Sequence, residues 1–240
     1  MQHAKINTGI PGLDEILYGG VLQGNSVLVT GAPGTGKTIL TMQFIIAGAR
    51  AGEPGLYITS EEEVDSIREM AREIYPGLDE LERKGMLTFI RQSISSKKLM
   101  SIVTPFEIIK KNKIRRVVLD SLTLFGYIHV AGEMDYRKEV LDFIQRMKEA
   151  EVTLMATAEK SFTHLDELEY EPEDFLFDGL ILLSKMRRSS SFERILTIAK
   201  MRNQGHMLDI YPFIIDGKGI KVFHDQLPFS LFEKDFRKEE

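Results

Sequence analysis

The sequence predicts a three-layer α/β fold with a mainly parallel central sheet and antiparallel C-terminal strands. Apolar runs typical of buried strands alternate with helical patterns from residue 26 to residue 158, which favours a parallel sheet covered by helices. The later apolar runs are joined by short turns, which is typical of antiparallel strands. A glycine-rich run, GAPGTGKT at residues 31–38, stands between the first of these strands and the first long helix.

Length and composition favour a single domain. The chain has 240 residues, of which 43% are hydrophobic and 28% charged, and it contains no linker, internal repeat or low-complexity tract. We therefore expect one domain over residues 1–240, with residues 226–240 forming a charged tail. The absence of cysteine excludes disulfides and thiolate metal sites. No apolar run reaches the roughly 18 residues of a membrane span, so we expect a cytoplasmic protein with no membrane partner.

Each element is predicted from its hydrophobic period and its end signals. Continuous or alternating apolar runs predict strands, apolar spacings of three and four predict helices, and Gly52 ends the first long helix. In chain order, the parallel part comprises a strand at 26–31, a helix at 37–52, a strand at 55–60, a helix beginning at Ser60, a strand at 86–91, a helix at 98–112, a strand at 115–120, a helix at 133–150 and a strand at 152–158. The antiparallel part comprises strands at 179–185, 192–202, 212–216 and 219–223.

The run GAPGTGKT fits the pattern G-x-x-x-x-G-K-[ST] of a phosphate-binding loop, the P-loop. Its glycines let the backbone curl so that successive N–H groups point at phosphate oxygens, and the following helix N-terminus adds partial positive charge. Lys37 supplies a point charge for the β- and γ-phosphates, so we expect it to act in catalysis. The expected nucleotide-binding residues are Gly31, Ala32, Pro33, Gly34, Thr35, Gly36, Lys37, Thr38 and Ile39.

A bound nucleotide also needs a carboxylate near its magnesium ion. Asp120 ends the apolar run RRVVLD at residues 115–120, in the position of a Walker B acid. An aspartate before a serine is otherwise a common turn signal. With a P-loop upstream, we expect Thr38 and Asp120 to hold Mg²⁺ and the cofactors to be ATP and Mg²⁺.

Residues 58–64, ITSEEEV, allow two functions for their acids. Ser60 and Glu63 have the spacing of a helix capping box. Ligands of such sheets bind beyond the carboxyl ends of the strands, so Glu61 and Glu62 are also placed to orient a water for attack on the γ-phosphate. Both functions can coexist, and we expect a catalytic carboxylate here, with Glu61 preferred over Glu62.

These motifs resemble those of the KaiC-like branch of the RecA superfamily. The resemblance covers residues 7–223 and includes the stretch NTGIPGLDEILYGGVLQGNSVLVTGAPGTGKT, the paired glutamates of SEEE, and the VVLDS run. It also includes FDGLILL and LMATAEK, which ends in Glu159, a residue whose contribution to the site stays open. The resemblance implies a RecA-like P-loop NTPase fold and a slow Mg-dependent ATPase.

The stretch AKMRNQGHMLDIYPF at residues 199–213 is the most specific part of the resemblance. In this family the matching residues project into the nucleotide site of the neighbouring subunit. The resemblance therefore implies that one chain contributes residues to the next, within a homo-oligomer that is a hexamer. The implied residues are Lys200, Met201, Arg202 and His206. Asn203 departs from the pattern, because the family usually has glycine there, so the turn after Arg202 is expected to differ.

Three functions remain open from the sequence. The first is a ring-forming ATPase with shared active sites. The second is a nucleotide-gated scaffold with negligible turnover. The third is a RecA- or RadA-type DNA repair or recombination protein, which would follow DNA with basic loops. Residues 161–178 oppose that function because they carry seven acids and no Lys or Arg, so we expect nucleic-acid binding to be weak or absent. Apart from the hexamer that the resemblance implies, the sequence identifies no partner protein, biological process or ring size.

Overall fold

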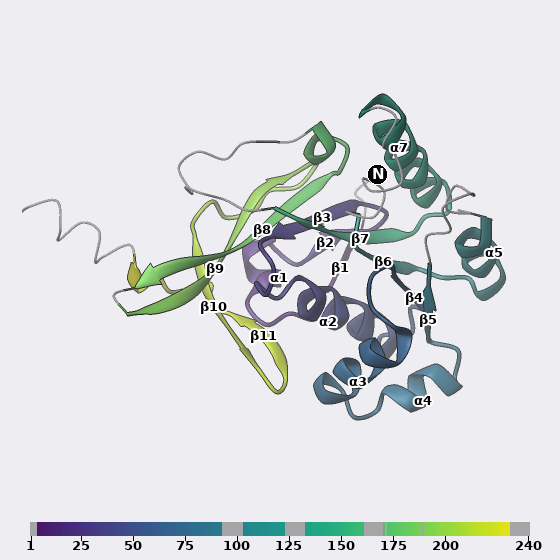
Figure 1. Ribbon diagram of the computed structural model, residues 1–240, viewed down its shortest axis with the longest axis horizontal. Helices are drawn as coiled ribbons and strands as arrows, with labels where there is room; N and C mark the ends of the chain where they lie inside the picture. The colour runs from purple at the N-terminus through teal and green to yellow at the C-terminus, as the bar shows by residue number, and fades with distance from the viewer. Residues whose placement is uncertain are drawn as a thin grey trace, which may run out of the picture.

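The computed structural model describes residues 4–92, 103–122, 133–160, 170, 172–188 and 190–230 (Figure 1). Its strands form two sheets. The small sheet pairs β1 (Lys5–Ile6) with β2 (Val21–Leu22). The large sheet contains β3 (Ser26–Gly31), β4 (Gly55–Thr59), β5 (Leu87–Arg91), β6 (Arg116–Asp120), β7 (Thr153–Glu159), β8 (Gly179–Arg188), β9 (Ser191–Met201), β10 (Tyr211–Asp216) and β11 (Gly219–Val222).

The large sheet has the strand order β11-β10-β9-β8-β3-β7-β6-β4-β5. Strands β3 to β8 pair in parallel, whereas β8, β9, β10 and β11 follow one another in antiparallel pairs. The expected parallel sheet with an antiparallel C-terminal extension is therefore confirmed.

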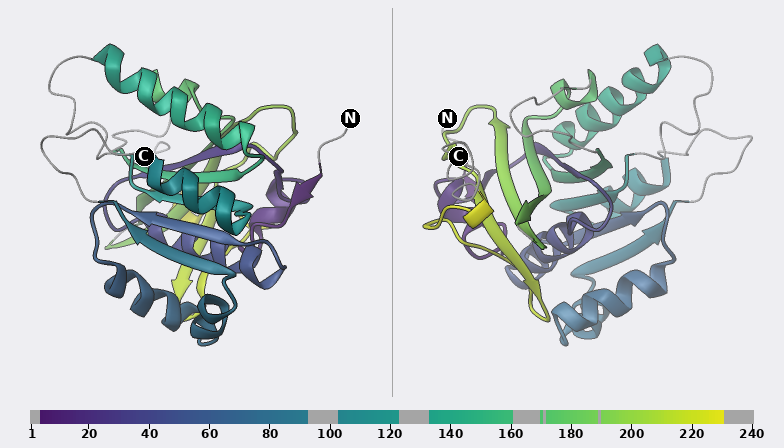
Figure 2. Two further views of the ribbon diagram at one scale, coloured as in Figure 1. Left: turned by 90° about the vertical axis from the view of Figure 1, so that its right-hand side faces the viewer. Right: turned by 60° about the vertical axis from the view of Figure 1, so that its left-hand side comes forward.

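Helices cover both faces of the sheet, which makes three layers. One face carries α2 (Lys37–Arg50), α3 (Val64–Ile74) and α4 (Leu78–Arg83), and the other carries α5 (Val103–Asn112) and α7 (Glu133–Glu149); Figure 2 shows the sheet between them. Short helices α1 (Leu13–Ile16) and η1 (Pro172–Phe175) complete the described elements.

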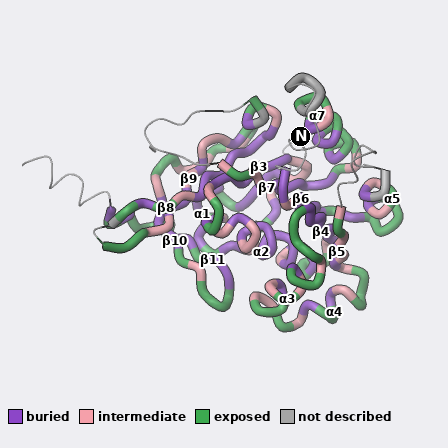
Figure 3. The backbone as a smooth tube through the Cα atoms, in the orientation of Figure 1, coloured by how far each residue is buried: buried purple, intermediate pink, exposed green. Residues whose placement is uncertain are grey.

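Side-chain alternation along the strands fills two separate cores. Val27 and Val29 belong to the core beneath α2 to α4, and Leu28 belongs to the core beneath α5 and α7. The central strands are thus buried on both faces (Figure 3), which explains their nearly continuous apolar sequences.

The helix expected after β4 is present, but its expected start at Ser60 is wrong. Helix α3 begins at Val64 after Glu63, which makes no side-chain capping bond, so the capping box is not formed. The Ser60 hydroxyl instead donates to the backbone oxygen of Asp120 at 3.0 Å and accepts from the amide of Ser121 at 2.8 Å. It thereby ties the end of β4 to the end of β6.

The boundaries of the other predicted elements agree with the structure to within a few residues. The structure also contains elements that the sequence did not predict. These are β1, β2, α1, α4 and η1, all of six residues or fewer. Of the helix expected at 98–112, residues 98–102 lie outside the described residues, as do residues 231–240 of the expected charged tail. Their structure is therefore not tested.

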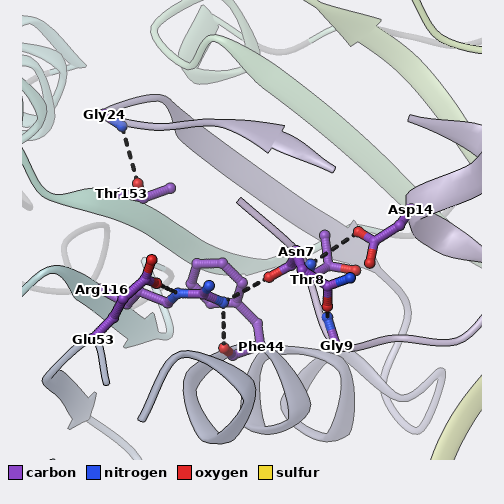
Figure 4. A network of polar contacts seen from close by, with 9 residues as sticks. All are labelled: Asn7, Thr8, Gly9, Asp14, Gly24, Phe44, Glu53, Arg116 and Thr153. Atoms are coloured by element: carbon purple, nitrogen blue, oxygen red, sulfur yellow. Dashed lines mark hydrogen bonds and ion pairs between the residues drawn. The ribbon is translucent and has the colours of Figure 1, made fainter. Parts of the chain in front are cut away.

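A buried arginine joins the N-terminal segment, α2 and β6 (Figure 4). The side chain of Arg116 is 3% exposed, and its Nε donates to Glu53 at 2.5 Å. Its Nη1 donates to the backbone oxygens of Asn7 at 2.8 Å and Phe44 at 3.0 Å. The guanidinium also lies over the ring of Phe44 at 4.7 Å. Each interaction crosses between elements that are distant in sequence, so this side chain fixes how they pack.

We expect Gly48→Ala to destabilise the domain, although alanine is the better helix former. A Cβ atom at Gly48, inside α2, would lie 2.3 Å from Cδ and 2.4 Å from Nε of Arg116. Because Glu53 and two backbone oxygens hold the guanidinium, it cannot move away freely. The free energy of unfolding should fall by about 1–3 kcal/mol, which urea unfolding would measure.

The matched control is the same substitution in an Arg116→Ala background. Without the guanidinium, Gly48→Ala should be neutral or stabilising by up to about 1 kcal/mol. An equal loss in both backgrounds would show that the clash with Arg116 is not the cause.

Candidate functional site

The P-loop connects β3 to α2. Gly34 and Gly36 adopt positive φ angles of 71° and 110°, a left-handed conformation that glycine enters without strain. Gly36 immediately precedes α2, and a Cβ atom there would lie 2.8 Å from Ile215 of β10. These positions explain why the motif has glycine here: the loop must turn sharply and pass close to a neighbouring strand.

Lys37 extends along the inner side of the P-loop. Its Nζ donates to the backbone oxygen of Gly31 at 2.8 Å and to that of Ala32 at 3.2 Å. Burial lowers the pKa of Lys37, and Glu159, Asp120 and Glu61 oppose this effect. The lysine is therefore surrounded by acids, in the place where a phosphate chain would need its charge.

Asp120 is the central acceptor of the site. It accepts at Oδ2 from the hydroxyl of Thr38 at 2.8 Å and from that of Tyr57 at 2.7 Å. Thr157 donates to its other oxygen. Burial and the charge of Asp120 raise the pKa of Tyr57 well above its ordinary value, so the phenol stays a donor. These bonds hold the carboxylate of Asp120 beside the hydroxyl of Thr38.

Thr38 and Asp120 fit a magnesium site of the kind found with nucleotides. Mg²⁺ is usually held by one or two protein groups together with phosphate oxygens and water, rather than by a cage of protein ligands. Within the described residues, no group of three or more His, Asp or Glu could hold a metal by itself. A hydroxyl and a carboxylate in contact at the end of the P-loop match the first arrangement.

The three glutamates after β4 have different environments. Glu61 accepts from the hydroxyl of Ser121 at 2.7 Å. The backbone of Glu62 is bonded to Thr59, and its pKa is raised by burial and by the charges of Asp120 and Glu61. Glu63 instead forms an ion pair with Arg91. Glu61 and Glu62 thus belong to the site, and Glu63 lies outside it.

A cavity of about 450 Å³ joins these groups. Of the expected site residues it is lined by Pro33, Gly34, Gly36, Lys37, Thr38, Ile39, Glu61, Glu62 and Asp120. Glu159, whose contribution was open, also lines it. The cavity therefore brings together both motifs and the acids of the SEEE run, although Thr38 and Asp120 alone are 82 positions apart in the sequence.

Sequence reasoning missed several residues of this cavity, namely Thr59, Met70, Ser121, Arg194 and Ile215. Arg194 is the most notable, because its Nε is buried and has no hydrogen-bond partner among the described residues. It lies directly opposite Lys185 across the β8–β9 pair. Two cations in that relation repel each other, which favours an anion at this end of the cavity. Only the strand register could have revealed this pair.

The residues expected to act in a neighbouring subunit do not line this cavity. Lys200 donates to the backbone oxygen of Asp174 at 2.6 Å, and Arg202 donates to that of Phe175 at 2.8 Å. Met201 is buried against Gly179. The Nδ1 atom of His206 lies 2.9 Å from the backbone oxygen of Met207.

The register of β9 explains this separation. Lys200 lies opposite Leu180, whose side chain packs in the core beneath α5 and α7, on the far face from α2. Arg194, at the other end of β9, lines the P-loop cavity. The six residue steps from Arg194 to Lys200 span about 20 Å. Asn203 has a φ of 60°, so this asparagine adopts the left-handed conformation that the family's glycine would permit.

A P-loop at the carboxyl end of β3, with the acid-ended strand β6 separated from β3 only by β7, defines a P-loop NTPase domain of RecA-like topology. The chain belongs to the KaiC family of ATPases, since the family described as "ATPase: KaiC" matches residues 6–227.

Known proteins support this assignment. The circadian clock oscillator proteins KaiC of Nostoc sp. and Synechococcus elongatus are each 32% identical to the chain over 231 residues. These matches cover 91% and 92% of this chain but 44% of each relative, so the chain spans less than half their length. A solved KaiC-like protein from the hyperthermophilic archaeon Pyrococcus horikoshii OT3 has a TM-score of 0.81 and 29% identity, covering 92% of this chain and 99% of that chain. Among the described helices, none is long and apolar enough to cross a membrane.

We expect Glu62→Gln to raise the free energy of unfolding at neutral pH without nucleotide. The pKa of Glu62 is raised in the folded chain, so the folded state binds this proton more tightly than the unfolded state. The resulting stability is present below the unfolded pKa and is lost as the pH rises through the raised pKa. Glutamine is neutral at every pH. The free energy of unfolding of Glu62→Gln should therefore exceed that of wild type at neutral pH and match it below about pH 4.

The control for this prediction is Glu63→Gln, measured by the same urea unfolding. It removes the ion pair with Arg91 and should cause a small loss of stability at neutral pH, below about 1 kcal/mol. A gain of equal size in both variants would mean that general acidity, rather than the position of Glu62, is responsible.

Proposed function

We propose that the protein is a Mg-dependent ATPase that hydrolyses ATP at the subunit boundaries of a homo-oligomeric ring, with six subunits expected from the family. The observation that carries this proposal is the hydrogen bond from the hydroxyl of Thr38 to the carboxylate of Asp120, within a cavity that Lys37 and Glu61 also line. Each part of phosphoanhydride hydrolysis has a suitable group there.

Each group has one function in the proposed reaction. Backbone N–H groups of the P-loop and Lys37 bind the β- and γ-phosphates, and Thr38 and Asp120 hold the magnesium ion, which neutralises the developing phosphate charge. Glu61, held by Ser121, orients a water and accepts its proton. The cavity also contains Arg194, which is suited to bind an anionic part of the nucleotide in its own subunit.

The contribution of a second subunit is supported by the place of Lys200 and Arg202. Both side chains bond to η1, away from the cavity of their own chain. Charge on a transferring phosphoryl group is commonly stabilised by such cations from a neighbouring chain. Met201 and His206 belong to the same stretch and would lie at the same boundary.

Two other functions are less well supported. A nucleotide-gated scaffold would use the same cavity, and turnover measurements separate it from an enzyme. A DNA-strand protein is disfavoured by the acids of residues 161–178, most of which lie outside the described residues. A cytoplasmic location stays a prediction, and no partner other than further copies of the chain is proposed.

We expect Lys37→Ala to abolish nucleotide binding and Glu61→Gln to abolish hydrolysis alone. ATP·Mg at a hundred times its dissociation constant should stabilise wild type and Glu61→Gln by about 2.7 kcal/mol, but should not stabilise Lys37→Ala. Phosphate release by Glu61→Gln should fall about 10²- to 10⁴-fold, because a general base is lost.

Lys84→Ala is the control, since Lys84 is an exposed lysine on the surface after α4. It should bind and hydrolyse ATP as wild type does. If ATP·Mg stabilises Lys37→Ala as much as wild type, the P-loop assignment fails. If wild type binds ATP but releases no phosphate, the scaffold function is correct instead.

We expect two inactive variants to restore activity when mixed. One chain carries Lys200→Ala and Arg202→Ala, and the other carries Glu61→Gln. Some boundaries would then pair an intact Glu61 with an intact cation pair from the neighbouring chain. The cations can contribute about 10³- to 10⁵-fold, so phosphate release should rise well above that of either variant.

Labelled subunits must show that the chains exchange. Absence of rescue despite exchange would mean that the cation pair acts within its own chain or has no part in hydrolysis.

A further inference from the structure

A buried ion pair lies between the P-loop and the Lys200–Arg202 pair of the same chain. Lys160 Nζ lies 2.9 Å from Asp174 Oδ2, and the two side chains are 9% and 4% exposed. Buried pairs of this kind contribute little net stability, because desolvation offsets most of the attraction. They do fix geometry, since separating the charges inside the protein is costly.

On one side, this pair orders the backbone that holds the two outward cations. Asp174 belongs to η1, and its backbone oxygen accepts from Lys200 at 2.6 Å. The next backbone oxygen, of Phe175, accepts from Arg202 at 2.8 Å. Lys200 Nζ also lies 5.8 Å from the centre of the Phe175 ring. The position of η1 thus sets the positions of both cations.

On the other side, the pair is attached to the nucleotide cavity. Lys160 follows Glu159, which lines the cavity at the end of β7. The amide of Lys160 donates to the backbone oxygen of Gly31 at 3.2 Å, the same oxygen that accepts from Lys37. Continuous contacts therefore lead from the P-loop through Lys160 and Asp174 to Lys200.

The negative charge of Asp174 also favours the charged form of Lys200 beside Arg202. Burial and the nearby Arg202 lower the pKa of Lys200, whereas Asp174 and Asp178 oppose this effect. The carboxylate therefore helps keep Lys200 charged beside a like charge.

We propose that the Lys160–Asp174 ion pair is a positioning device that holds Lys200 and Arg202 in the geometry needed by the neighbouring subunit's nucleotide. Neither residue of the pair touches the reacting atoms; both act through η1. This inference rests on the proposed function, in which the cation pair acts across the subunit boundary.

The mixing experiment can test the inference because it separates the two tasks of a chain. The donor chain, carrying Glu61→Gln, supplies the cations. The acceptor chain, carrying Lys200→Ala and Arg202→Ala, supplies the P-loop and Glu61. Asp174→Asn is introduced into either the donor or the acceptor, and phosphate release is measured against ATP concentration.

We expect the substitution to matter only in the donor. There, kcat of the mixture should fall about 10²-fold, as for a misplaced catalytic group, with KM unchanged because the acceptor's P-loop still binds ATP. In the acceptor it should leave both constants unchanged. A general structural defect would lower activity in either position.

The other outcomes overturn the inference. An equal loss of kcat with Asp174→Asn in either chain would assign Asp174 a structural role. A loss of kcat only in the acceptor would mean that the pair acts in the site of its own chain. No loss of kcat in either chain would exclude positioning. Absence of rescue in the parent mixture would instead remove the proposed action across the boundary, and this inference with it.

Two further variants complete the experiment. Lys160→Met removes the other member of the pair and should show the same donor-only loss; it decides the matter if the melting temperature shows that Asp174→Asn does not fold. Asp142→Asn is the control, because it makes the same chemical change in the exposed Arg146–Asp142 pair. It should have no effect in either chain.

Discussion

The parallel register of the four central strands is the constraint on which the site depends. In this register Gly31 lies opposite Glu159, and Thr59 lies opposite Asp120. The ends of β3, β7, β6 and β4 therefore meet at one edge of the sheet. A slip of one residue would turn every apolar side chain of a strand to the other face, and both faces are already filled by separate cores. Core packing thus determines where the P-loop and the acids lie.

The convergence of strand ends also concentrates negative charge. Asp120, Glu61 and Glu159 all act on Lys37, and burial together with the charges of Asp120 and Glu61 raises the pKa of Glu62. Hydrogen bonds from neutral hydroxyls stabilise Asp120 without adding a competing cation. A magnesium ion and a phosphate chain would complete this balance, because the first offsets the acids and the second engages the lysine. The arrangement gives up some stability of the free domain in favour of ligand binding.

The sequence was informative where one physical rule dominated. Buried strands have continuous apolar sequences, and the P-loop has a fixed spacing of glycines, so β3, α2 and the end of β6 at Asp120 were predicted correctly. The start of α3 was not, because the Ser60 hydroxyl bonds to the backbone at Asp120 and Ser121, a contact that depends on strand pairing. Arg194 was missed for a similar reason. Its place depends on the β8–β9 register, which contains an irregularity near Leu180 that the sequence does not reveal.

The course of strand β9 supports the proposal that one chain contributes to two sites. Because β9 runs antiparallel to β8, and β8 runs parallel to β3, the start of β9 lies near the P-loop edge and its end lies near the opposite edge. Arg194 near one end faces its own cavity, while Lys200 at the other end turns to the far face of the sheet. Arg194 and Lys200 of one chain are therefore separated by about 20 Å along the strand and lie on opposite faces of the sheet. In the proposed ring, each boundary would join one chain's P-loop to the next chain's Lys200 and Arg202.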